Sequence, residues 1–221
     1  LVRIRERNGS IMPPGLFIPV AEDSGQILEL GERVFEKVCH FLHHTEVLQL
    51  GLHYIEVDLS VVQCEKNDLA ERLISIANTY EIDPRWINLE ITETGSIRAR
   101  QTLLENMKKL IEHGFSFSLD DFGKGESNLM YVVEMPVCIV KLDYDMSKAF
   151  FCSEKAKHVV RAVISMAHGM NLKVVAEGIE TETEAGEMYV EGIDYIQGYY
   201  YARPLPVQEF LEFLRKNAVQ A

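Results

Sequence analysis

The chain has 221 residues, of which 47% are hydrophobic and 25% charged, so it carries enough apolar material for a folded core and lacks the composition of a disordered segment. Its 34 Asp and Glu against 22 Lys and Arg give a formal net charge of −12, which argues against unaided binding to a nucleic acid polymer or an anionic membrane. Because no apolar run reaches the roughly 18 residues of a membrane span and LVRIRERNG does not resemble a signal peptide, we expect a cytoplasmic protein or domain without membrane contact of its own.

The N-terminal part alternates between strand and helix patterns. Residues 1–5 (LVRIR) are a strand candidate, followed by a proline-bounded segment, PPGLFIPVAED. Apolar residues then recur at helical spacing over 24–43, and HYIEVDLS at 53–60 alternates apolar with polar residues, the period of a strand. Asn67 or Asp68 can cap the next helix, which closes at EIDP.

The same order repeats along the rest of the chain. The expected strands are 86–92, 115–120, 138–143, 172–177 and 194–198, and the expected helices are about 97–113, a short one after Ser127, 154–169, 181–191 and 205–217. This alternation predicts one α/β domain with a mainly parallel sheet. Seven strand candidates are one short of a (β/α)₈ barrel, and an open doubly wound sheet is the alternative, although no G-x-G-x-x-G follows a strand.

Acidic residues fall near the carboxyl ends of five successive strand candidates. They are Asp58, Glu90, Asp120 with Asp121, Asp143 beside Lys141, and Glu177. The carboxyl ends of parallel strands form the rim where α/β proteins place their chemistry. Any one of these acids could be an ordinary turn or cap residue, but together they would repel one another unless protons or cations neutralised them.

The adjacent Asp120 and Asp121 end an apolar strand and precede a loop with two glycines. Oxygen-rich sites select hard ions such as Mg²⁺ or Mn²⁺, and two such ions can clamp the attacking and leaving oxygens of a phosphoryl displacement. We therefore expect both aspartates to reach one metal pair where the strand gives way to the loop. Lys141 could hold a water or stabilise a phosphate there, or could be a salt-bridge partner of Asp121 or Asp143.

A series of segments in a fixed order indicates the family: PPGLFIPVAED, LEITE, SLDDFGKGESNL, VKLD, VVAEGIET and QGYYYARPLP. In these segments the sequence resembles the EAL family of cyclic di-GMP phosphodiesterases, over essentially the whole of residues 1–221. The resemblance implies a single modified TIM (β/α)₈ barrel that uses two Mg²⁺ or Mn²⁺ ions to hydrolyse one bond of cyclic di-GMP, giving linear pGpG. It also implies a homodimer and is compatible with an upstream sensory or diguanylate cyclase domain.

The resemblance also implies a role for each matching residue. The metal ligands would be Asp58, which stands where the family has Asn, with Glu90, Asp120 and Asp121. The catalytic residues would be Lys141 at the water, Glu177 as general base or near the metals, Glu93 holding the glycine-containing loop, and Gln197 near the water. Arg3 and Phe17 would bind the substrate.

Two departures from the family pattern leave the activity open. Leu1 aligns with the L of the family's name motif, so the metal-binding Glu of that motif and one barrel strand are expected upstream of residue 1. The family usually reads DFGTGYSSL where this chain has Lys124, Glu126 and Asn128 in place of Thr, Tyr and Ser. The chain is therefore either an active phosphodiesterase or a degenerate module that binds cyclic di-GMP or a protein partner without cleavage. A barrel without any ligand is disfavoured, because nothing would then offset the repulsion at the rim.

Overall fold

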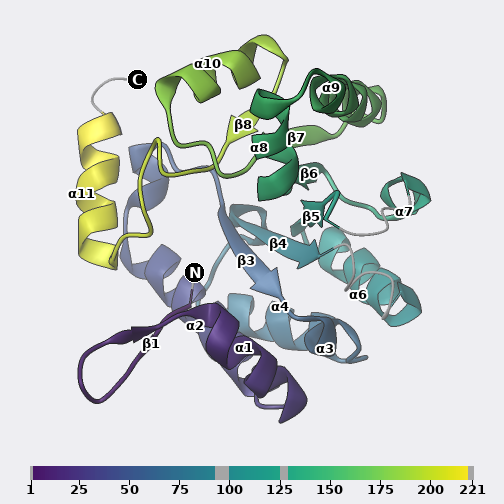
Figure 1. Ribbon diagram of the computed structural model, residues 1–221. Coiled ribbons are helices and arrows are strands. Elements are labelled where there is room, and N and C mark those ends of the chain that lie inside the picture. The colour runs from purple at the N-terminus through teal and green to yellow at the C-terminus, as the bar shows by residue number, and fades with distance from the viewer. Residues whose placement is uncertain (1, 93–99, 125–128, 219–221) are drawn as a thin grey trace.

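The core of the molecule is a curled, six-stranded parallel sheet whose strands follow one another in chain order (Figure 1). The computed structural model describes residues 2–92, 100–124 and 129–218. The sheet strands are β3 (Ile55–Leu59), β4 (Ile87–Thr92), β5 (Ser116–Phe122), β6 (Ile139–Leu142), β7 (Lys173–Ala176) and β8 (Tyr195–Ile196). Each pairs with the next in parallel, so all six carboxyl ends lie on one rim.

Helices cover the outside of this sheet (Figure 1). They are α1 (Pro14–Asp23), α2 (Ile27–His44), α3 (Val61–Cys64), α4 (Leu69–Thr79), α6 (Arg100–Glu112), α7 (Leu129–Glu134), α8 (Tyr144–Cys152), α9 (Glu154–Gly169), α10 (Glu182–Val190) and α11 (Val207–Ala218), with the 3₁₀ turns η1 (Val47–Leu50) and η2 (Pro84–Trp86). Parallel strands joined by outer helices are expected to be covered on both faces. Accordingly β4 is buried from Ile87 through Ile91, and β6 is buried throughout.

The structure confirms the predicted fold class: one α/β domain with a TIM-barrel-like parallel sheet. The expected helix at 154–169 coincides with α9, and the expected strands at 86–92 and 172–177 each lie within one residue of β4 and β7. The first strand candidate differs, because β1 (Ile4–Arg5) pairs antiparallel with β2 (Ile11–Met12) in a separate hairpin instead of joining the sheet.

Asp143 illustrates the ordinary explanation for an acid at a strand end. It is the N-cap of α8, where its carboxylate accepts a hydrogen bond from the Met146 backbone N–H at 2.9 Å. The side chain therefore satisfies the helix terminus and does not join the acids described below.

None of the described helices has the length and apolar character needed to cross a membrane.

Candidate active site

Carboxylates from three strands and from the segment after β7 meet at the carboxyl-end rim of the sheet. We call this set the acidic cluster: Glu56, Asp58, Glu90, Asp120 and Glu177. Strand register explains why these side chains converge. Asp58 of β3 pairs with Glu90 of β4, and Asp120 of β5 pairs with Thr92, which lies two residues after Glu90 on β4. Glu177 follows directly after β7.

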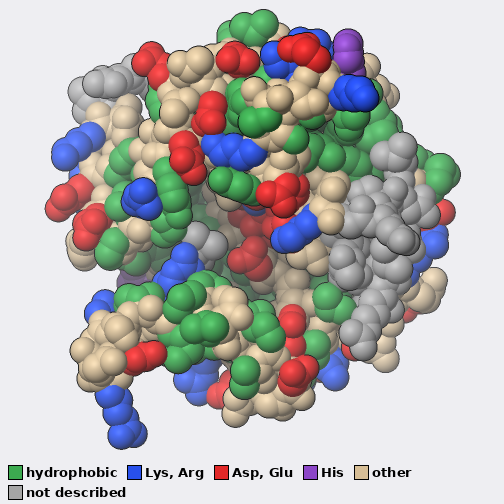
Figure 2. All heavy atoms as spheres, viewed as in Figure 1, with side chains coloured by type: hydrophobic (Ala, Val, Ile, Leu, Met, Phe, Trp, Pro, Cys, Tyr) green, Lys and Arg blue, Asp and Glu red, His purple; other side chains and the backbone are tan. Residues whose placement is uncertain are grey.

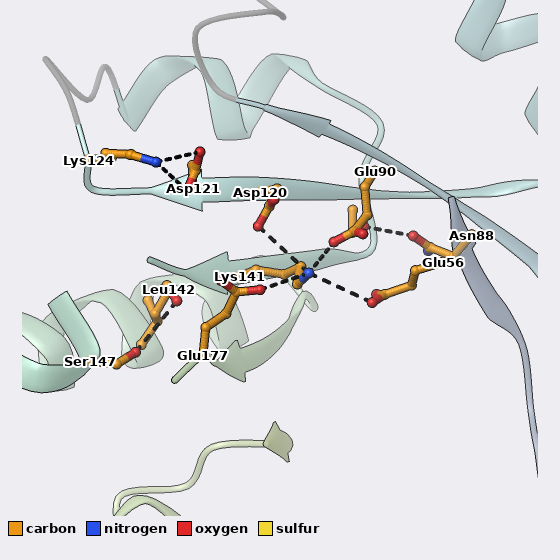
Figure 3. Close-up of polar contacts among 11 residues, drawn as sticks. Glu56, Asn88, Glu90, Asp120, Asp121, Lys124, Lys141, Leu142, Ser147 and Glu177 are labelled. Carbon is orange, nitrogen blue, oxygen red and sulfur yellow. Dashed lines mark hydrogen bonds and ion pairs between the residues drawn. The ribbon is translucent and has the colours of Figure 1, made fainter. Parts of the chain in front are cut away.

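Lys141 of β6 lies at the centre of the acidic cluster and is only 2% exposed (Figure 3). Its Nζ donates a hydrogen bond to Glu90 and forms an ion pair with Glu177 Oε1 at 2.9 Å. Asp120 Oδ1 and Glu56 Oε2 lie farther away, at 3.7 and 3.8 Å from the same nitrogen. Lys141 therefore forms salt bridges, as the alternative prediction stated, but its partners are these four acids and not the predicted Asp121 or Asp143.

One ammonium does not balance five carboxylates. Burial raises the pKa of Glu56, Glu90, Asp120 and Glu177, although the charge of Lys141 works in the opposite direction on each. Burial by itself would lower the pKa of Lys141, but the surrounding carboxylates outweigh it and raise that pKa. The cluster therefore holds excess negative charge that bound protons or cations must neutralise.

Three members of the cluster fit a hard divalent cation. Asp58, Glu90 and Asp120 each offer one carboxylate oxygen, and these atoms all lie within 4.8 Å of one another. Among the described residues, Asp120 Oδ1 is a buried oxygen without a hydrogen-bond partner. An all-oxygen donor set with an unsatisfied buried acceptor suits Mg²⁺ or Mn²⁺.

Asp121 does not lie with these three acids. The pairing of β5 with β6 shifts register between Leu119 and Phe122, and Asp121 occupies the left-handed region with a φ of 55°. Both of its carboxylate oxygens accept from Lys124 Nζ at 3.1 Å (Figure 3). The strand does give way at the aspartates, but Asp121 is held by a lysine of the following loop.

A buried polar network fixes the strands that carry Glu90 and Asp120. Asn88 donates from Nδ2 to Ser116 Oγ at 2.9 Å, and Ser118 Oγ donates to Asn88 Oδ1 at 2.7 Å. Asn88 and Ser118 are fully buried. These bonds tie β4 to β5 directly below the acidic cluster and restrict the position of its carboxylates.

Glu56 belongs to the acidic cluster although the sequence motifs did not indicate it. It lies two residues before Asp58 on β3, so both side chains point to the same face of the strand. The alternation in HYIEVDLS places Glu56 and Asp58 on one face of the strand but does not indicate that this face points into the cleft.

Four members of the acidic cluster, Glu56, Asp58, Glu90 and Glu177, line a cleft of about 610 Å³, and acidic side chains are visible in the central hollow (Figure 2). Arg3 and Gln197, both predicted site residues, line the same cleft. So do Tyr144 and Tyr199, which are about half exposed, and Arg203 stacks on the Tyr199 ring at 4.2 Å from its centroid. The cleft thus combines acids, two arginines and four aromatic side chains, since Phe210 and Phe213 line it as well.

Two predicted site residues lie elsewhere. Phe17 of α1 is buried and lines a different cavity, of about 510 Å³, between the β1–β2 hairpin and helices α1 and α2. Glu93 lies outside the described residues, as do Glu126 and Asn128 of the divergent loop.

Comparison with known proteins agrees with this geometry. The EAL domain family matches residues 1–204. The chain is 29% identical over 222 residues to the signaling protein YkoW of Bacillus subtilis and 31% identical over 220 residues to the cyclic di-GMP phosphodiesterase PdeB of Shewanella oneidensis, in both cases over 100% of this chain. It is 30% identical over 215 residues, or 96% of this chain, to MucR of Pseudomonas aeruginosa, a bifunctional diguanylate cyclase and cyclic di-GMP phosphodiesterase.

The solved phosphodiesterase part of MucR, in complex with c-di-GMP, superposes with a TM-score of 0.86 at 29% identity, covering 95% of this chain and 85% of that one. The chain spans 27%, 26% and 31% of the lengths of YkoW, PdeB and MucR. The family match covers nearly the whole chain and agrees with the acidic rim of the TIM-barrel-like sheet. This chain therefore belongs to the EAL domain family.

Proposed function

We propose that this chain hydrolyses one phosphodiester bond of cyclic di-GMP to give linear pGpG, with two Mg²⁺ or Mn²⁺ ions. The observation that carries the proposal is the group of carboxylates formed by Asp58, Glu90 and Asp120, in which the buried Asp120 Oδ1 has no hydrogen-bond partner. The ion pair of Lys141 with Glu177 lies beside this group. Relatives named as cyclic di-GMP phosphodiesterases support the choice of substrate.

The acids of the cluster would hold the metal ions. Asp58, Glu90 and Asp120 would supply the first oxygens, and Asp121 would join them after leaving Lys124. A bound dication would supply Lewis-acid polarisation of the phosphate and of the attacking water.

The side chains of the protein would position the remaining groups. Arg3 would pair with a phosphate of the dinucleotide, and the exposed rings of Tyr144 and Tyr199 offer stacking surfaces for its two bases. Glu177 would accept the proton of the water as that water bonds to phosphorus and the bond to the 3′ oxygen breaks, and the released 3′ oxygen would take a proton from solvent water. Lys141 Nζ, 2.9 Å from Glu177 Oε1, would keep that carboxylate oriented, and Gln197 would line the space near the water.

One observation favours a second candidate function, a receptor that binds cyclic di-GMP without cleavage. The contact of Lys124 with both oxygens of Asp121 removes a predicted metal ligand. Such a module would still offer the cleft with Arg3 and the two tyrosine rings. A homodimer and an associated sensory or diguanylate cyclase domain also stay predictions.

Hydrolysis of cyclic di-GMP separates the two functions. We expect the purified chain to release pGpG in Mg²⁺ or Mn²⁺, and Glu90→Gln or Asp120→Asn to abolish turnover while the circular dichroism spectrum stays unchanged. Asp23→Asn is the matched control, because Asp23 is an exposed acid at the end of α1 and outside the cleft. If the chain binds cyclic di-GMP but forms no pGpG at any metal concentration, the phosphodiesterase proposal is wrong and the receptor function is favoured.

A further inference from the structure

We infer that the C-terminal turn of α2 is a surface site for a transition-metal dication such as Zn²⁺, Ni²⁺ or Cu²⁺, with His40 and His44 as its two protein ligands. This site is distinct in chemistry and place from the acidic cluster. None of its histidines lines the 610 Å³ cleft.

Helix geometry brings the two imidazoles together. Residues four apart lie on the same helix face, one turn above the other, and both histidines fall within α2 (Ile27–His44). Their ring centroids are 4.0 Å apart with an interplanar angle of 20°, so the rings are stacked. The terminal side-chain torsion of each ring is soft, so the two rings can turn toward one shared ion.

One hydrogen bond selects the ligating nitrogen of His44. Its Nδ1 lies 2.9 Å from the carbonyl oxygen of His40, and since a carbonyl only accepts, Nδ1 carries the hydrogen. The lone pair of the neutral ring is then on Nε2, which has no hydrogen-bond partner among the described residues. Metal-binding histidines commonly have their second ring nitrogen fixed to a carbonyl in this way.

The surroundings of the pair also favour a cation. The last turn of an 18-residue helix presents the negative end of its dipole and unsatisfied carbonyl groups. Both rings are exposed, so an ion can reach them and keep water in its remaining coordination positions. His43 packs edge-on against His44, with centroids 4.8 Å apart.

Imidazole nitrogen determines which ions fit. It suits Zn²⁺, Ni²⁺ and Cu²⁺, whereas Mg²⁺ prefers oxygen ligands, so excess Mg²⁺ occupies the acidic cluster and leaves the histidine pair available. This preference allows the two kinds of site to be measured separately in one sample.

The test is calorimetric titration of NiCl₂ into the folded chain in excess Mg²⁺. His113 provides the matched control: it lies at the end of α6 with the same contact, Nδ1 to the carbonyl oxygen of Lys109 at 2.8 Å, but has a lysine four residues before it in place of a histidine. We expect one Ni²⁺ to bind to the parent and to His113→Ala. His40→Ala and His44→Ala should each weaken that binding by at least about 10-fold, as the loss of a direct ligand exceeds the effect of losing an outer-shell partner.

X-ray absorption on the Zn²⁺-loaded chain gives a second readout, with zinc–nitrogen distances of about 2.0–2.1 Å expected in the parent and lost in either variant of the pair. Turnover of cyclic di-GMP should be equal in all four proteins. Equal Ni²⁺ affinity in the parent, His40→Ala and His44→Ala would overturn the site, whether or not the chain hydrolyses cyclic di-GMP.

Discussion

Replacing Lys124 with alanine should strengthen metal binding at the acidic cluster. Lys124 Nζ contacts both carboxylate oxygens of Asp121, the residue directly after the proposed ligand Asp120. Without Lys124, the Asp121 carboxylate is no longer paired with a side-chain cation and is available to a metal ion. The electrostatic repulsion of an incoming dication also decreases, because one positive charge has been removed. Both changes act in the same direction.

The exposure of the pair sets the size of the effect. The side chains of Lys124 and Asp121 are 62% and 34% exposed, so the ion pair is a surface one. Such pairs contribute about 0.2–1 kcal/mol, which corresponds to a decrease of about 1.4- to 5-fold in the dissociation constant of the metal. The gain should shrink at high salt, because screening already weakens the pair in the parent.

The assay is Mn²⁺ titration by calorimetry, followed by Mn²⁺-dependent release of pGpG. Lys124→Arg keeps the pair and should behave as the parent. Lys157→Ala is the matched control, because Lys157 pairs with Glu154 at the same three-residue spacing and 3.1 Å on α9, away from the cleft. Weaker Mn²⁺ binding in Lys124→Ala would refute the reasoning and assign the lysine a supporting role in the site.

Three further changes test other parts of the structure. Lys141→Met should destabilise the metal-free chain by about 3–5 kcal/mol in urea unfolding, because it leaves buried carboxylates unpaired, and Mg²⁺ should restore part of the loss; no change would show that the acids are protonated. Gly198→Ala would make its Cβ clash with the Ile179 carbonyl oxygen and should lower the free energy of unfolding by about 1–3 kcal/mol, whereas Gly186→Ala, with open space around it, should not. Burial acts to raise the pKa of Asp194, but hydrogen bonds from Lys173, His168 and the Val174 N–H outweigh it and lower that pKa. Because the folded pKa lies below the unfolded value of about 3.9, the stability from Asp194 is present above that pH and is lost as the pH falls through the folded pKa. Asp194→Asn should therefore cost about 1.5–3 kcal/mol at neutral pH, and its unfolding curve should approach that of the parent below about pH 4; a difference independent of pH would contradict this assignment.

The periodic segments could be predicted from the sequence because local signals and packing agree there. For α9, Ser153 caps the N-terminus and four apolar residues at helical spacing are buried, so its bounds follow from the pattern. The segment PPGLFIPVAED was not predicted to be helical, yet it forms α1. Pro14 occupies the first helical position, where its missing N–H and fixed φ are compatible with a helix.

At the site, the sequence predicted the acids but not their partners. Asp58, Glu90 and Asp120 share a rim because parallel strands end together, which the alternation of strand and helix implies. The contact of Asp121 with Lys124 depends on a register shift and a left-handed residue, and neither has a periodic signature. Glu56 was missed because strand periodicity shows which residues share a face but not which face points into the cleft.

Arg3, the proposed substrate-binding residue, lies on a different structural unit from the proposed metal ligands. The acids stand on a sheet with continuous neighbours, whereas Arg3 directly precedes β1, in a two-stranded ribbon held by two residue pairs and largely open to solvent. The proposed substrate contact of Arg3 and the proposed metal ligands thus have different backbone support: a ribbon of two residue pairs for the arginine and a six-stranded sheet for the acids.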